Sequence, residues 1–440
     1  MSDATASLAN LPVTPSPPPE RWRWWHAALT ALWHGLFLLP FMRRLDLIGA
    51  GAKYPLFIDS YPLLAAGETH ARGGNPFLPM VLDVFNHRPH SYSSWWFALG
   101  DLGLTRADNA WFGALLVLAF AVAAWTCLRP RAPGELGWTV GAVCAAPMLL
   151  AVNRANNDLV VFALLTPVVP CLLHPSRLVR LAAPMLIAAA AGLKYYPVAA
   201  GLLLLAEPDL RDRRFRLVLF ALVMALVGLS VAGDLPYLMK NQPHVEGYLG
   251  LGAANLLDLF GVSEAWRGRI TLLVGLALGC AGWFARGRDG GLRRMAGDAA
   301  WLRFVLGATL LGGCFWIGLS WGYRWVLGLW MVPFLWKPTR PEDLPAPLRR
   351  AWQAARVALW PALWGGWLYF LAYGFLEAHG HAPPVWVNRS AMTLVQTACW
   401  VLFGATTVMV GAFAWDGLAG LWPGRGGGLR SAGPAAKVPT

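Results

Sequence analysis

Twelve apolar runs divide this sequence, and they restrict it to a helical membrane protein. Lipid offers no hydrogen-bond partner to free backbone groups, so each run is predicted to be a helix. The runs lie at about 24–42, 110–128, 137–152, 159–173, 181–193, 196–206, 217–233, 269–285, 299–319, 325–336, 352–376 and 391–414. An even number of crossings would leave both termini on the same side of the bilayer.

The composition excludes a soluble protein. Of the 440 residues, 57% are hydrophobic and 13% are charged, and the charged share is about half of that in soluble domains. A chain this apolar could not cover its own surface with polar groups. Disordered, collagen-like and disulfide-scaffold classes of protein are excluded as well. The lipid bilayer is therefore a predicted binding partner of the chain.

The distribution of basic residues predicts which side is cytoplasmic. Cytoplasmic loops carry an excess of Lys and Arg. With the N-terminus inside, the inner segments hold 23 of the 36 basic residues. We therefore expect a multi-pass cell-membrane protein with both termini in the cytoplasm. The net charge of +13 then reflects these loops, and no nucleic-acid partner is expected.

This topology divides the chain into three parts. Residues 1–23 are expected to be a disordered cytoplasmic N-terminus, and the apolar run after them to be an uncleaved signal anchor. Residues 24–414 form the membrane domain, with large outer loops at about 43–109 and 234–267. The Gly/Pro/Ala-rich tail 415–440 is expected to be disordered and cytoplasmic.

The stretch 181–206 is predicted to be a short hairpin, because the loops on both sides of it are basic. Thirteen residues of helix rise only about 20 Å, against a hydrocarbon core of about 30 Å. The tip, Lys194–Pro197, would then lie below the outer surface, with Pro197 in the first turn after the break. A lysine at that depth needs an anionic partner. The alternative is one long kinked helix with Lys194 extended towards the interface.

Two motifs of nucleotide-binding and metal-dependent enzymes are absent. The sequence contains no GxxxxGK[ST] or HExxH motif, each of which would signal a known chemistry. The pairs His87/His90 and His379/His381 lack an obvious carboxylate partner. The six cysteines lie in apolar runs without a CxxC pair, so we expect small buried side chains. No metal and no cofactor are predicted.

Asp59 in the first outer loop is the candidate general base. Apolar neighbours suggest that it lies near the membrane boundary, where partial desolvation would raise its basicity. The alternatives are a helix cap, or a salt bridge with Lys53 or Arg72.

Polar residues also cluster at the turn Asn153–Asp158, with sequence NRANND, between two apolar runs. Six polar or small residues are more than such a turn needs, and they suggest a polar cluster. The alternative is ordinary capping, with Asp158 as N-cap of the next helix.

Three cations are predicted on the outer side near the membrane boundary. They are Arg154, Lys194 and Arg324, the last in the turn Ser320–Arg324. Together they could bind a phosphate diester without a metal, because arginine offers a bidentate fork and lysine a point charge. The alternative is that each one anchors to lipid head groups.

Four motifs in order resemble glycosyltransferase family 87. They are Asp59-Ser60-Tyr61 with Ala65-Ala66 and Gly74-Asn75-Pro76-Phe77, then Asn153–Asp158, then Gly192–Pro197, then Gly322-Tyr323-Arg324. The resemblance covers about 55–330. It implies the C-type glycosyltransferase fold, with a sugar carried on polyprenyl phosphate and a glycan or glycolipid acceptor, as in α-mannosyltransferases of the family.

The resemblance also assigns a catalytic role to an acidic residue of the first outer loop, which corresponds to Asp59. Many relatives carry an acidic residue before the Tyr-Arg pair, whereas this chain has Trp321 and Gly322. A role for that position is therefore not carried over.

The resulting hypothesis is an inverting membrane hexosyltransferase whose active site faces the periplasm or exterior. Asp59 would be the base, and Arg154, Lys194 and Arg324 would bind the donor phosphate. The side chains expected to bind sugar or acceptor are Asn156, Asn157, Asp158, Tyr195, Tyr196, Tyr61, Glu68 and Asn75.

Two other functions share these features. A transporter or flippase of a lipid-linked or anionic solute would also have twelve helices and buried cations. The long first outer loop and the lack of a visible internal repeat favour the enzyme. A polymerase or ligase acting on lipid-linked glycans would use the same site with a larger donor.

Overall fold

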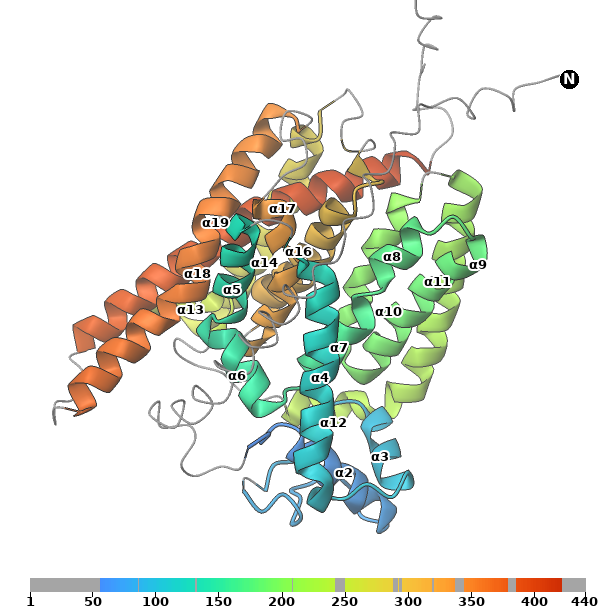
Figure 1. Cartoon of the computed structure of the whole chain (residues 1–440), viewed down its shortest axis with the longest axis vertical. Helices are drawn as coiled ribbons and strands as arrows, with labels where there is room; N and C mark the ends of the chain where they lie inside the picture. The colour runs from blue at the N-terminus through green and yellow to red at the C-terminus, as the bar shows by residue number, and fades with distance from the viewer. Residues whose placement is uncertain are drawn as a thin grey trace, which may run out of the picture. The chain divides into compact units, whose positions relative to one another are not determined.

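A computed structural model of the chain describes residues 56–421, apart from 86, 131–132, 208, 242–249, 288–291, 293–294, 319, 337–343 and 379–384 (Figure 1). The first predicted helix, the predicted N-terminal tail and the pair His379/His381 lie outside the described residues, as do residues 422–440 of the predicted C-terminal tail. Within them, the chain is built from helices, together with one antiparallel pair of two-residue strands, β1 (Gly250–Leu251) and β2 (Ser320–Trp321).

The first outer loop forms a small group of short helices at one end of the bundle, seen at the bottom of Figure 1. They are α2 (Tyr61–Ala71), η2 (Ser94–Phe97), α3 (Ala98–Asp101) and η3 (Arg106–Asp108). Glycines allow α2 and α3 to touch: a Cβ on Gly67 would lie 2.6 Å from the backbone nitrogen of Gly100.

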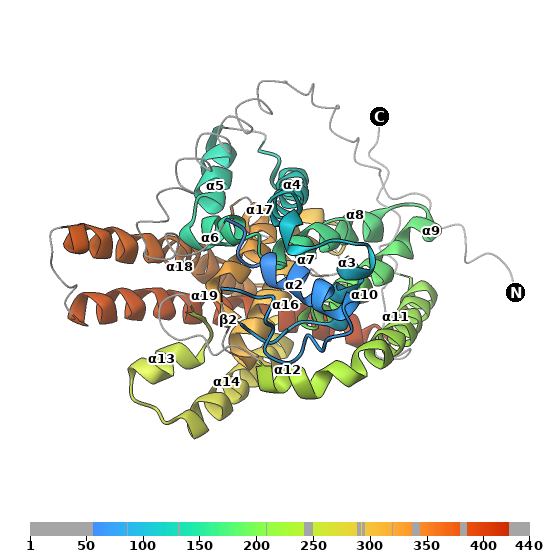
Figure 2. The same cartoon turned by 90° about the horizontal axis from the view of Figure 1, so that it is seen from below.

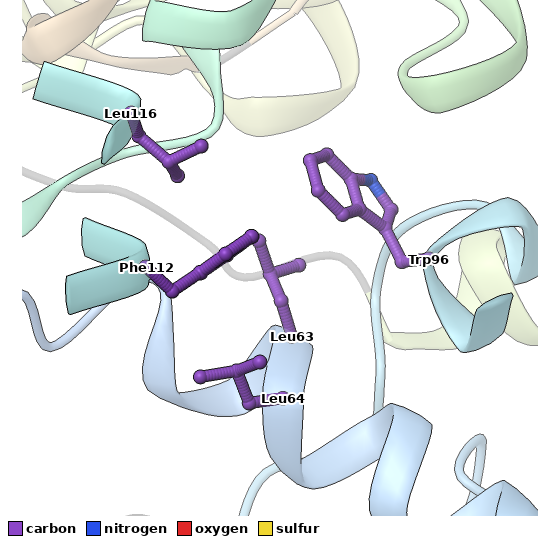
Figure 3. Packing of buried hydrophobic residues seen from close by; sticks show 5 residues of the cluster. All are labelled: Leu63, Leu64, Trp96, Phe112 and Leu116. Carbon is purple, nitrogen blue, oxygen red and sulfur yellow. The ribbon is translucent and has the colours of Figure 1, made fainter. Parts of the chain in front are cut away.

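A hydrophobic cluster joins this outer group to the bundle (Figure 3). Leu63 and Leu64 of α2 lie against Trp96 of η2 and against Phe112 and Leu116 of α4, and all five side chains are buried. The outer loop is thus fixed on the membrane helices, which gives Asp59, two residues before α2, a fixed place.

The first half of the bundle contains two long spans with several short segments between them. The elements are α4 (Asn109–Leu128), α5 (Pro133–Val143), α6 (Ala146–Arg154), α7 (Asp158–Leu165), α8 (Val168–Leu173), α9 (Arg177–Arg180), α10 (Ala182–Leu193), η4 (Tyr196–Ala206), α11 (Leu210–Val231), η5 (Ala232–Asp234) and α12 (Leu235–Asn241).

The second half is organised around α16, which packs against η4, η6 and α19. The elements are α13 (Ala254–Leu259), α14 (Glu264–Ala285), α16 (Ala299–Ile317), η6 (Gly322–Trp330), α17 (Val332–Trp336), α18 (Ala346–Ala378) and α19 (Val385–Ala419). Helices α18 and α19 lie side by side in both views (Figure 2).

The chain is an all-α integral membrane protein, but the expectation of twelve spans does not hold in the described residues. Five helices are long and apolar enough to cross a bilayer, or six if the α5–α6 pair, bent by 56°, counts as one. The five are Arg106–Leu128, Leu210–Asn241, Glu264–Ala285, Ala299–Ile317 and Arg389–Ala419.

The difference arises because an apolar run is not always one continuous helix. The run 159–173 is divided between α7 and α8 around Pro167, and 325–336 between η6 and α17. Segments of five to twelve residues are shorter than the roughly 20 residues that span the hydrocarbon core. Counting apolar runs therefore overstated the number of complete crossings.

The predicted break at Lys194 is confirmed. Helix α10 ends at Leu193, Lys194 is extended with φ −158° and ψ 114°, and η4 begins at Tyr196 with Pro197 in its first turn. Because η4 packs back against α10, the alternative of one long kinked helix is wrong. The expectation for the cysteines holds only in part: Cys280 is exposed and Cys171 partly so.

Candidate functional site

The backbone before α2 lies beside the end of α6. The N–H of Phe57 donates to the carbonyl of Asn153 at 3.0 Å, and that of Asp59 to the carbonyl of Arg154 at 2.9 Å. Helix α6 ends there because Ala155 adopts a left-handed conformation, with φ 44°. These two hydrogen bonds hold Asp59 next to the turn that carries Arg154 and the two asparagines.

Asp59 is engaged by three donors. Arg154 binds it in a bidentate manner, Nη2 to Oδ1 at 2.7 Å and Nε to Oδ2 at 2.9 Å, and Asn156 Nδ2 donates to Oδ2 at 2.7 Å. The side chain is only 7% exposed. Two of the sequence alternatives are wrong, because Arg72 pairs with Glu68 instead and α2 has no side-chain cap. The third, a salt bridge with Lys53, lies outside the described residues.

The expected rise in the basicity of Asp59 is wrong for this state of the protein. Burial by itself would raise the pKa of the carboxyl group. The charge of Arg154 and the hydrogen bonds from Arg154 and Asn156 outweigh it, so the pKa lies below its ordinary value of 3.8. A bidentate charge-assisted pair stabilises the ionised form more than burial opposes it.

Asp158 is the centre of a second buried group. It is fully buried, and its Oδ1 accepts from Lys194 Nζ at 2.5 Å and from Tyr196 Oη at 2.6 Å. Its Oδ2 lies 3.8 Å from Arg324 Nε. Lys194 also donates to Asn157 Oδ1 at 2.7 Å. The capping alternative for Asp158 is wrong, because it is the first residue of α7 and its carboxylate pairs with these cations.

The two carboxylate groups belong to one cluster. Asn156 contacts Asp59, and its neighbours Asn157 and Asp158 contact Lys194. Tyrosine rings surround the lysine: Nζ lies 5.3 Å from the ring centroid of Tyr92, 5.7 Å from that of Tyr196 and 6.0 Å from that of Tyr323. We name Asp59, Arg154, Asp158, Lys194 and Arg324 the outer charged cluster.

Packing of η6 on α7 brings Arg324 into this cluster. The rings of Phe162 and Trp330 stack with centroids 4.5 Å apart, and Trp330 Nε1 donates to Thr166 Oγ1 at 3.2 Å. Arg324 itself lies over the ring of Tyr196 at 4.9 Å, and its Nη1 donates to Cys314 Sγ at 3.3 Å.

The outer loop fixes the break that presents Lys194. The indole Nε1 of Trp96 donates to the carbonyl of Leu193 at 3.1 Å, which satisfies a carbonyl freed by the end of α10. The ring of Trp95 covers Gly192, where a Cβ would lie 2.3 Å from the ring. The glycine is therefore required by the close approach of the loop.

Four residues predicted to bind sugar or acceptor contact residues outside the outer charged cluster. Glu68 pairs with Arg106 Nε at 2.8 Å, Tyr61 reaches the carbonyl of Leu82 at 3.5 Å, and Asn75 accepts from the N–H of Phe77 at 2.9 Å. Tyr195 faces Ser93 and Asp234.

Tyr92, Tyr323 and Cys314 are members of the site that sequence reasoning missed. Tyr323 lies inside the Gly322–Arg324 motif and could have been found there. Tyr92 and Cys314 carry no local signal, because they reach the lysine or the arginine only through the fold.

The histidines of the outer loop serve the loop itself. His90 is buried, its Nε2 lies 3.2 Å from the carbonyl of Ser93, and burial lowers its pKa to about 4. His87 Nδ1 lies 3.4 Å from the carbonyl of Met80. Among the described residues, no three His, Cys, Asp or Glu side chains gather as metal ligands would.

Comparisons of this chain with family models, with curated proteins and with solved structures give no match. The site must therefore be interpreted from its own geometry.

Proposed function

We propose that the protein is an inverting membrane hexosyltransferase. It moves a mannose-like sugar from a polyprenyl-phosphate donor to a glycan or glycolipid acceptor at the outer face of the cell membrane. The observation that carries this proposal is the outer charged cluster, in which three cations and two carboxylates meet where α6, α10 and η6 end or begin. The proposal includes a C-type glycosyltransferase-like bundle with both termini in the cytoplasm.

The charges of the cluster suit a phosphate diester. Three cations and two carboxylates leave one positive charge among the described residues, and a phosphate diester carries one negative charge. The nearby Arg88 is paired with Asp83 at 3.8 Å and adds no net charge. A buried charge is stable only when it is paired, so a singly charged donor would complete the site.

Donor binding would also free the base. In the described state, Arg154 holds both oxygens of Asp59, and a carboxylate held in this way is a weak base. A phosphate that draws the guanidinium of Arg154 towards itself would release Asp59 and raise its basicity. The base would then be active only when the donor is bound, which would protect the donor from premature reaction.

The chemical step follows from this exchange. Asp59 takes the proton of the acceptor hydroxyl as its oxygen bonds to the anomeric carbon, and the bond from that carbon to the phosphate oxygen breaks. Polyprenyl phosphate leaves with a second negative charge. Because protonation of Asp59 removes one negative charge from the protein, the cluster remains balanced, and Lys194 and Arg324 stabilise the leaving phosphate.

Asn157 and Asp158 are the best candidates to recognise the sugar by hydrogen bonds. In the described residues, Asn157 Nδ2 and Asp158 Oδ2 are buried without a hydrogen-bond partner. One is a donor and the other an acceptor, and a hydroxyl group can satisfy both. Asn156 and Tyr196 are held by the two carboxylates and would orient them.

The test is transfer from radiolabelled polyprenyl-phosphate mannose to an acceptor lipid by purified protein in detergent. Asp59→Asn should reduce turnover by about 10²- to 10⁴-fold, while Asp101→Asn, at an exposed position of the same loop, should not. Intrinsic fluorescence and gel filtration verify that both variants are folded. Near wild-type turnover by Asp59→Asn would remove the proposed base, and liposome uptake without any product would favour the transporter.

A further inference from the structure

A second buried charged cluster lies at the other end of α10 from Lys194. Helix α10 has 12 residues and is therefore about 18 Å long. Its far end meets α9 and the start of α11, opposite to α2 in Figure 1. We name the residues Arg177, Arg180, Glu207, Asp212 and Arg216 the Arg216 cluster.

The cluster consists of three arginines on two carboxylates. Arg216 Nη2 lies 2.5 Å from Glu207 Oε2, and Arg180 Nη1 lies 3.4 Å from both oxygens of the same carboxylate. Asp212 Oδ2 is 3.2 Å from Arg177 Nε and 3.5 Å from Arg180 Nη2. Arg216 and Glu207 are each only 2% exposed in their side chains.

The neighbouring charged groups are already engaged. Arg213 Nη1 donates to the carbonyl of Gly417 at 2.9 Å and Arg214 Nη2 to that of Leu421 at 2.8 Å. These arginines therefore cap the C-terminal end of α19, where cations are favoured. The exposed Asp209 accepts from the first N–H groups of α11, those of Arg211 and Asp212.

The Arg216 cluster is incomplete in two respects. Its three arginines exceed its two carboxylates by one positive charge. In addition, Arg216 Nη1 and Arg180 Nε are buried and make no hydrogen bond within the described part of the chain. Buried polar groups are normally hydrogen-bonded, and an unsatisfied donor on a buried charge is particularly unfavourable. A singly charged acceptor group would correct both.

Apolar surface begins beside this cluster. Leu178 is 77% exposed, Phe215 56% and Val218 59%, on the same two helices as the arginines. In a membrane protein such side chains face lipid. The charged cluster therefore lies at the level where acyl chains meet head groups, and phosphate is the anion available there.

We propose that the Arg216 cluster binds a singly charged phosphate group, either the phosphodiester of an anionic lipid head group or free phosphate. Arg180 and Arg216 donate to its oxygens through the two unsatisfied N–H groups, with the planar geometry that suits phosphate. This site is separate from the proposed transferase site and independent of that activity.

The experiment measures binding of phosphatidylglycerol to the purified full chain in neutral detergent by native mass spectrometry. Arg180→Lys and Arg216→Lys keep the charge that pairs with Glu207 but lack the unsatisfied donor. Each should weaken the apparent affinity about tenfold, the effect of losing one charge-assisted hydrogen bond. Arg211→Lys, exposed on the same helix, is the control and should bind as the wild type does.

Sodium phosphate, titrated while thermal unfolding is followed, distinguishes the two sources. Free phosphate is the ligand if phosphate stabilises the wild type, both Lys variants lose this stabilisation, and the wild type does not bind phosphatidylglycerol. Equal affinity of the wild type and both Lys variants for both ligands overturns the proposal, as does binding of neither ligand by the wild type. If Arg216→Lys does not fold, Arg180→Lys alone decides, because its side chain is less buried.

Discussion

Breaking the buried ion pair of Lys194 and Asp158 should lower the free energy of unfolding more than most single substitutions in the chain. Asp158 is fully buried and Lys194 is 6% exposed, with 2.5 Å between Nζ and Oδ1. Asp158→Asn keeps the shape but leaves the lysine without a charged partner and removes the counter-charge of Arg324. Removing one partner of a buried pair costs about 3–5 kcal/mol, and Lys194→Met should lie at the lower end because Asp158 retains Arg324.

A double-mutant cycle isolates the interaction. We expect the double variant to lose less than the sum of the two single losses, by about 1–3 kcal/mol, because its second substitution removes a group already unpaired. The free energy of unfolding is measured by equilibrium titration with SDS, followed by tryptophan fluorescence. Asp101→Asn, exposed in the outer loop, serves as the control and should change it by less than about 0.5 kcal/mol.

Additive single effects, within about 0.5 kcal/mol, would refute the reasoning. Lys194 and Asp158 would then not interact in the folded protein, and the break after α10 would need another cause. The result does not depend on any enzymatic activity, so it tests the geometry of the outer charged cluster separately from its proposed chemistry.

Two further predictions concern the outer loop. Gly192→Ala would set a Cβ 2.3 Å from the Trp95 ring and should lower the free energy of unfolding by about 1–3 kcal/mol. Gly228→Ala, with open space around it, is the control and should not lower it. Equal losses in the two variants would contradict the close approach of Trp95 to Gly192. The hydrogen bond from Arg106 holds the pKa of Glu68 below its ordinary value of 4.5. The unfolded chain thus binds the proton more readily, so wild type should exceed Glu68→Gln in stability by about 1.5–3 kcal/mol above pH 5. This difference in stability should shrink as the pH falls below 4.5. A difference that grew at low pH would contradict the lowered pKa of Glu68.

The members of the outer charged cluster could be predicted from the sequence because each is marked locally. Arg154 and the asparagines stand in a polar turn between apolar runs, and Lys194 stands beside Pro197 where a helix must break. Local chemistry of this kind identifies residues that do not fit an ordinary membrane helix. It does not identify their partners, since the pairing of Asp158 with Lys194 depends on how α7 meets the end of α10.

The number of spans and the state of Asp59 could not be predicted, for related reasons. Hydropathy measures how apolar a segment is, but proline and polar turns decide how long its helix continues, as at Pro167. Proximity to the membrane correctly suggested that Asp59 is desolvated. Its pKa is nevertheless lowered, because Arg154 reaches it from a turn 95 residues later in the chain, and no local pattern encodes that contact.

Both buried clusters share one arrangement, and the membrane environment explains it. Each places three cations on two carboxylates in the described residues. Cations with no partner at all could not remain buried in an empty site, whereas full neutralisation would leave nothing to attract an anion. Two carboxylates on three cations satisfy both demands, because they hold the site together and leave a single charge. Such a site favours a monoanion over a dianion, and the proposed monophosphate-linked donor would fit the outer charged cluster better than a diphosphate-linked one.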